Sequence, residues 1–213
     1  MRRKSSNDLL QAMKAYFPEY DPKAHFLNEL SLLHGVKMPT TGGGEFPLNN
    51  ANTKQLVGVS DFQGTLIPSD ATGFIRSVVV RYGSYACAVE TTPGTARDPQ
   101  ALDGTTHTTP AIVDFKETRA DMPAWLLSSE LVLKARGVEC FRMRIQDVVP
   151  SVAPDQIPSD WAKELEKTIK VQGGQDLQLF LNTPEYASDP TVNKDDYVQI
   201  VLFGLKFAPR KRN

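Results

Sequence analysis

Residues 197–207 read Tyr-Val-Gln-Ile-Val-Leu-Phe-Gly-Leu-Lys-Phe. This run is dense in β-branched and aromatic residues, which fit the pleated surface of a sheet better than a helix. It is the most strand-like stretch of the chain. We therefore expect a central β-strand here, and the rest of the fold is worked out from it.

The strand-like pattern extends back to about residue 54. Residues 138–149 alternate clearly, with Cys140, Arg142 and Arg144 on one face and Phe141 and Met143 on the other. Further strands are expected at residues 55–62, 73–82, 84–90, 111–117, 126–135 and 176–181. Since no strand–helix–strand alternation is visible, we expect antiparallel sheets packed as a β-sandwich or jelly roll, not a parallel doubly wound sheet. A hairpin is expected at Arg136-Gly137.

The first 53 residues lack the strand pattern and show helical patterns followed by a Gly/Pro-rich segment. Asp8 is placed to cap a helix that runs through Tyr16, and Asp21-Pro22 begins a second helix that ends near Gly35. The apolar positions of this expected helical hairpin are Leu9, Leu10, Met13, Phe17, Phe26, Leu27, Leu30 and Leu33. The sequence thus predicts a helical arm over residues 1–38, a Gly/Pro-rich linker over 39–53, and a β-sandwich domain over 54–213 with a basic tail. One short inserted helix is expected at residues 159–167, carrying Trp161 and Leu165.

Composition excludes several classes of protein. The chain has 213 residues, 40% of them hydrophobic and 23% charged, which is ordinary for a folded protein and excludes global disorder. No run approaches the roughly 18 apolar residues of a membrane span. The polar residues after Met1-Arg2-Arg3-Lys4 predict no secretory leader, and Cys87 and Cys140 are too few for a disulfide scaffold. We expect a protein made in a reducing cytoplasm, with both thiols half-buried and inert.

Basic residues are clustered at the two ends of the sequence. Basic triplets lie at the N-terminus (Arg2, Arg3, Lys4) and near the C-terminus (Arg210, Lys211, Arg212). They hold 6 of the 24 basic residues, which leaves 18 basic against 25 acidic residues, a net charge of −7, in the body. Short basic arms bind polyanions through phosphate neutralisation, so nucleic acid or an anionic lipid surface are the expected partners. The alternative is that these charges only keep the chain ends soluble.

Catalytic and metal-binding patterns are absent from the sequence. His25 and His34 are nine residues apart, and His107 stands alone in a long Thr-rich loop. Residues 42–44 (Gly-Gly-Gly) lack the Lys-Ser/Thr that follows a phosphate-binding loop, so a hinge is expected. Asp195-Asp196 is interpreted as a pair of solvated turn charges, with cation binding as the alternative. We therefore assign no catalytic residue, no cofactor and no metal.

Three further features of the sequence can be interpreted. Residues 91–110 form a loop of a length usually reserved for function or partner contact. Arg142 and Arg144 are expected to pair with acidic residues of a neighbouring strand. Trp125 and Trp161 are expected to be core anchors, not platforms on which bases stack.

The chain resembles jelly-roll capsid proteins of icosahedral bacteriophages in its β-region. The resemblance lies in Leu66-Ile67-Pro68, in residues 74–83 (Phe-Ile-Arg-Ser-Val-Val-Val-Arg-Tyr-Gly), in the proline-punctuated loops and in the strand-rich C-terminal end. It implies a non-enzymatic shell subunit that forms trimeric or pentameric capsomers, located in the virion and made in the host cytoplasm.

We therefore expect a structural subunit that self-assembles into a homo-oligomer with other virion subunits. The apolar residues of the arm would contact a neighbouring subunit. The two basic triplets would meet the genome or an internal membrane. The alternatives are a phage tail, baseplate or connector subunit, a β-sandwich module that binds carbohydrate or peptide, and an enzyme with a dispersed site.

Overall fold

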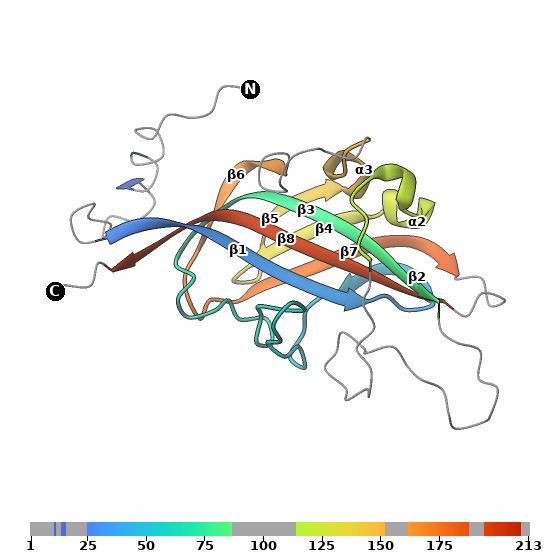
Figure 1. Cartoon of the computed structure of the whole chain (residues 1–213), viewed down its shortest axis with the longest axis horizontal. Helices are drawn as coiled ribbons and strands as arrows, with labels where there is room; N and C mark the ends of the chain where they lie inside the picture. The colour runs from blue at the N-terminus through green and yellow to red at the C-terminus, as the bar shows by residue number, and fades with distance from the viewer. Residues whose placement is uncertain are drawn as a thin grey trace.

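The computed structural model describes residues 25–86, 114–151, 162–187 and 194–209, together with Gln11, Lys14 and Ala15. Two four-stranded antiparallel sheets pack face to face, so the predicted β-sandwich is confirmed (Figure 1). The strands are β1 (His25–Lys37), β2 (Thr41–Pro47), β3 (Gly73–Ala86), β4 (Glu130–Ala135), β5 (Val138–Arg144), β6 (Lys163–Val171), β7 (Leu177–Ala187) and β8 (Lys194–Pro209). The helical elements between them are short: η1 (Arg119–Asp121), α2 (Ala124–Leu127) and α3 (Ile145–Val148).

The strand order is nested. Sheet A has the order β1-β8-β3-β6 and sheet B the order β2-β7-β4-β5. The first strand therefore pairs with the eighth, the second with the seventh, the third with the sixth and the fourth with the fifth. Two further ladders, β3 with β8 and β4 with β7, complete the sheets. The strand pairing is that of one long hairpin folded over on itself.

Strand β8 is central, as its sequence predicts. It lies between β1 and β3 (Figure 1), pairing with β1 without interruption from His25↔Pro209 to Lys37↔Tyr197. The ladder with β3 is interrupted once, by a register shift between Ile75 and Ser77. A bulge of this kind bends a strand and increases its twist.

The helix expected from Asp21-Pro22 to Gly35 is wrong over its main part, because residues 25–37 form strand β1. Leu30 and Leu32 lie in the core, and His34 beyond them is buried as well. These residues recur every two positions, which is the period of a strand with one face inward. Thirteen paired positions along β8 outweigh the local signals for a helix. For the expected first helix, Gln11, Lys14 and Ala15 are helical and the remaining positions lie outside the described residues.

The expected linker at residues 39–53 contains strand β2, which pairs with β7. The segment after β2 is also fixed, because the Asn49 amide donates to the carbonyl of Leu177 and accepts from the backbone N–H of Leu179. Both bonds are 2.8–2.9 Å long and buried. Glycine-rich composition predicted a flexible link here, but the structure incorporates the segment into sheet B.

Of the remaining expectations for single elements, some are wrong and the hairpin is confirmed. Residues 163–167 belong to strand β6 and not to a helix, and β3 continues through Gly83 to Ala86, where two separate strands at 73–82 and 84–90 were expected. The hairpin at Arg136-Gly137 is confirmed. Both of its turn residues have positive φ, 54° and 75°, which matches the tight hairpin turn that suits the twist of its strands.

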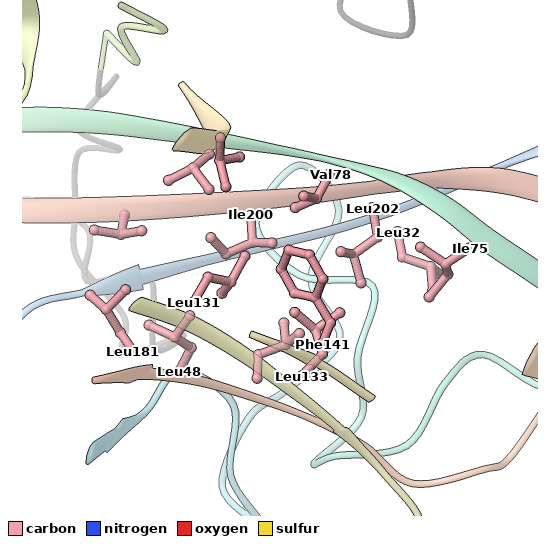
Figure 2. Packing of buried hydrophobic residues seen from close by; sticks show 14 of the residues in the cluster. Leu32, Leu48, Ile75, Val78, Leu131, Leu133, Phe141, Leu181, Ile200 and Leu202 are labelled. Atoms are coloured by element: carbon pink, nitrogen blue, oxygen red, sulfur yellow. The ribbon is translucent and has the colours of Figure 1, made fainter. Parts of the chain in front are cut away.

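The core lies between the two sheets. Figure 2 shows Val78, Ile200 and Leu202 of sheet A facing Leu131 and Leu133 of sheet B. Phe141 of β5 and Leu48, after β2, fill space between the layers. Interdigitation of the two inner faces is the main source of stability in a sandwich.

We expect Leu133→Ala to lower the free energy of unfolding by about 2–5 kcal/mol, because it leaves a cavity between the sheets. Val138→Ala is the matched control, since Val138 is 67% exposed at the β4–β5 hairpin. That control should change stability by no more than about 0.5 kcal/mol. Urea denaturation of both variants measures the difference, and equal effects would contradict the assigned core.

Candidate functional site

The structure places only part of the predicted contact residues. Both basic triplets lie outside the described residues, as do Leu9, Leu10, Met13 and Phe17. Phe26 lies in β1, but its side chain is outside the description. Leu30 is 3% exposed in the core of its own chain, whereas Leu27 and Leu33 have the opposite parity in the strand and lie on the outer face of sheet A. The single apolar stripe expected of a helix is thus divided between two faces.

The outer face of sheet B is charged and paired. Arg142 forms ion pairs with Glu130 of β4 at 2.9 Å and with Glu139 of β5 at 2.8 Å. The hydrogen bonds from Arg142 hold the pKa of both carboxyls below the usual range. Lys134 pairs with Glu45 at 2.9 Å and lies over the ring of Phe180. The expected pairing of Arg142 with a neighbouring strand is confirmed.

The outer face of sheet A is largely apolar. Val198, Ile200 and Leu202 of β8 point into the core, so the alternate residues point outward. Arg81 and Gln199, hydrogen-bonded at 3.1 Å, lie on this face. The apolar members of the outward set are Val201, Phe203, Leu205 and Phe207 of β8 with Phe74 and Val79 of β3. Phe74, Val79 and Val201 are at most 3% exposed, although none belongs to the core between the sheets. Sheet A therefore has buried apolar residues on both faces.

A polar cluster occupies the end of sheet A where β8 begins. Asp195 forms an ion pair with Lys37 at 2.6 Å, and Asp196 accepts a hydrogen bond of 2.5 Å from the hydroxyl of Tyr82. Burial and this carboxylate raise the pKa of Tyr82 far above its usual range. The two aspartates are thus strand residues with protein partners, so the expectation of solvated turn charges is wrong. In the part of the chain that is described, no group of three His, Cys, Asp or Glu residues is placed to hold a metal ion.

His34 is a buried structural histidine. Its Nε2 donates to the carbonyl of Leu48 at 2.8 Å, since a carbonyl accepts only, and its Nδ1 lies 2.9 Å from the hydroxyl of Ser60. Burial lowers the pKa of His34, and the bond to Leu48 opposes that shift only in part. The ring is neutral at pH 7 and ties β1 to the segment that follows β2.

The thiol of Cys140 fits its expected inert role. It is half-buried in β5 and donates to the carbonyl of Leu133 at 3.2 Å. Burial raises its pKa, which disfavours the reactive thiolate. Cys87 and His107 lie outside the described residues, as do Trp161 and residues 91–110.

An open hollow lies where β2 and β7 pair irregularly. It is lined by Gly42, Gly43, Gly44, Thr183, Glu185 and Tyr186. The ring of Tyr186 occupies the space that a side chain at Gly42 would need, and it stacks on Trp125 of α2 with centroids 4.2 Å apart. Its hydroxyl donates to the carbonyl of Pro39 at 3.1 Å. Trp125 is thus a packing residue, as expected, but it packs beside a surface hollow and not in the centre of the core.

Sequence reasoning missed this aromatic pair and the acidic partners of Arg142. Tyr186 and Trp125 are 61 positions apart in the chain, and only the fold brings them together. Glu130 and Glu139 flank the predicted hairpin, so its register could have identified them.

No family model, curated protein or solved structure matches this chain. Within the described ranges, no helix combines the length and apolar character needed to cross a membrane. Function is therefore inferred from the residues and the fold.

We expect stability to fall as the pH drops from about 7.5 to 5. The unfolded histidine titrates near pH 6.5, whereas folded His34 has a lower pKa, so the unfolded chain binds more protons in this window. Denaturant midpoints at several pH values measure the effect.

His34→Gln is the control for this dependence. It should cost about 1–3 kcal/mol at pH 7.5, because a buried bonded group is replaced, and it should flatten the pH profile. An unchanged profile in this variant would show that other groups cause the acid sensitivity.

Proposed function

We propose that this chain is a non-enzymatic structural subunit of a large symmetric assembly, and specifically a bacteriophage capsid protein with a jelly-roll fold. The observation that carries the proposal is the nested pairing of first with eighth, second with seventh, third with sixth and fourth with fifth strands. Two Greek keys folded over in this way give a jelly roll, an architecture shared by viral capsid proteins, lectins and cupins.

The histidine chemistry speaks against the cupin branch of that architecture. Both ring nitrogens of His34 are engaged by Leu48 and Ser60 inside the fold, so this histidine has no free nitrogen for a metal. His25 packs edge-on against Phe207, with ring centroids 5.3 Å apart. A cupin centre needs several convergent imidazoles, and neither of these two rings is placed for that role.

The unequal outer faces support assembly. Sheet B carries a paired, charged outer face, whereas sheet A carries Phe203, Leu205 and Phe207 half-buried on its outer face. Apolar surface rimmed by polar residues is typical of protein interfaces. Packing between copies through sheet A would remove the exposed parts of Phe203 and Leu205 from water, whereas Phe74, Val79 and Val201 are already buried within the chain. The partners are then other copies of the chain and other virion subunits.

The basic ends support a contact with a polyanion. The body carries a net charge of −7, and each terminal triplet carries +3. Three charges bind weakly alone, but many copies in a shell multiply weak contacts. In this proposal the triplets face the genome, with an internal anionic membrane as the alternative.

A second candidate is a binding module for carbohydrate. It is favoured by the stacked pair Trp125–Tyr186 beside the polar hollow that contains Thr183 and Glu185. Aromatic faces next to hydroxyl and carboxylate groups suit a sugar ring, which has apolar and polar sides.

We expect light scattering of the purified chain to give a mass well above 23.6 kDa that grows with concentration toward a closed particle. Electron microscopy of that fraction then separates a shell from a tail or baseplate part. A monomer at every concentration would contradict the assembly proposal and favour the binding module.

Replacing Arg210, Lys211 and Arg212 by Ser should weaken binding to single- or double-stranded DNA and to anionic vesicles alike. Each lost phosphate contact lowers the slope of log K against log salt by roughly 0.7–0.9, so a loss of about 2–3 is expected. The matched control replaces three exposed basic residues of the body, Lys54, Arg144 and Lys167. Equal slopes for the wild type and the tail variant would show that the tail does not contact the polyanion and only keeps the chain end soluble.

A further inference from the structure

The outward backbone groups of Leu27, Glu29 and Ser31 in strand β1 have no bonded partner among the described residues. Met38 donates its N–H to Asp196 at the end of the β8 ladder, and even-numbered residues of β1 share that direction. Gly35 instead donates outward, to the carbonyl of Val59. The N–H and C=O groups of Leu27, Glu29 and Ser31 therefore also point outward, away from β8. None of these groups is bonded to a described residue.

The second half of the same edge is closed by the chain itself. The carbonyl of Leu33 accepts from the N–H of Asp61, and the Asp61 carboxylate accepts from the N–H of Leu33 at 2.7 Å. From Leu33 toward Leu27, no described residue bonds to this edge. Asn28, Glu29 and Ser31 are exposed, and β1 lies at the margin of its sheet (Figure 1).

The other three edges carry features that discourage strand addition. Strand β2 has a register shift within its three glycines and ends at Pro47. Strand β5 has a register shift opposite Leu133 and Lys134. Strand β6 carries charges at most positions: Lys163, Glu164, Glu166, Lys167 and Lys170. Bulges, prolines and charges are the usual protection of sheet edges, and the free part of β1 has one carboxylate and no bulge.

We propose that this edge binds strand β1 of a second copy, antiparallel and related by a two-fold axis. This interface rests on the proposed function, because it names the contact through which copies assemble. Sheet A then continues from one copy into the next. An extended strand is the partner chemistry that an unpaired row of N–H and C=O groups requires.

When the two-fold axis passes through Asn28, the residues of the two β1 edges are complementary. Leu27 then lies opposite Glu29 of the other copy, so the outward groups of both residues are paired. No like charges face each other, whereas an axis at Glu29 would oppose two carboxylates. The same register joins the apolar outer faces of the two sheets.

Proline substitution tests the backbone pairing. Glu29→Pro removes an N–H that points away from β8 and that would bond Leu27 of the other copy, so the β1–β8 ladder stays intact, and Glu29→Gln is the matched control that keeps the N–H. Two hydrogen bonds are lost per pair of chains, so self-association should weaken tenfold or more in the proline variant and remain unchanged in the glutamine variant. Sedimentation measures the association, and circular dichroism checks the fold.

Cysteine cross-linking tests the register. Asn28 would face its own copy as a non-hydrogen-bonded pair with Cα atoms about 4.5 Å apart, within reach of a disulfide. Asn28→Cys should give a cross-linked dimer on oxidation. Ser31→Cys should not, because the two positions would lie roughly 20 Å apart. The wild type, with its native Cys87 and Cys140, gives the background.

The outcomes separate this interface from the proposed function. A wild type that assembles while Glu29→Pro assembles equally well overturns the β1 interface and leaves the capsid proposal standing. Equal cross-linking of the two cysteine variants also overturns the interface. A wild type that stays monomeric overturns both.

Discussion

The pairing of β8 with β1 on one side and β3 on the other is the interaction on which the rest of the molecule depends. These two ladders set the register of three long strands, and the register decides which side chains face sheet B. Val198, Ile200 and Leu202 enter the core, so Val201, Phe203 and Leu205 must face outward. A slip of one residue in β8 would exchange these two sets. Because both sets are apolar, pairing partners as well as the hydrophobic pattern must hold the register.

The sequence predicted this central element and the sandwich class, because a long β-branched run has few other stable environments. It misled at β1, where Leu27, Leu30 and Leu33 fit a helical stripe while Leu30 and Leu32 fit a strand. Local spacing supports both interpretations, and only the partner β8 decides between them. Strand β6 misled similarly, since Trp161 and Leu165, on which the expected helix rested, are four positions apart, a spacing common to helices and strands.

The candidate sites differ in how far they could be predicted. The pairing of Arg142 with acidic neighbours followed from the hairpin, a contact between residues near in sequence. The network of His34 with Ser60 and Leu48 joins segments that are 14 to 26 positions apart, and it depends on how the chain after β2 returns to the edge of β1. The free edge itself has no sequence signature, because it is defined by where the cover from residues 59–61 stops.

The edge and the outer face of sheet A meet at Leu27, whose backbone points off the edge and whose side chain lies on that face. This coincidence has a physical consequence for assembly. Backbone pairing alone gives direction and register but little apolar burial, and face packing alone gives burial with little register. In the proposed contact, pairing of β1 with β1 supplies direction and register and places the two outer faces of sheet A on the same side of one continuous sheet. Sheet B differs, because Arg142 on its outer face pairs with Glu130 and Glu139 of the same chain.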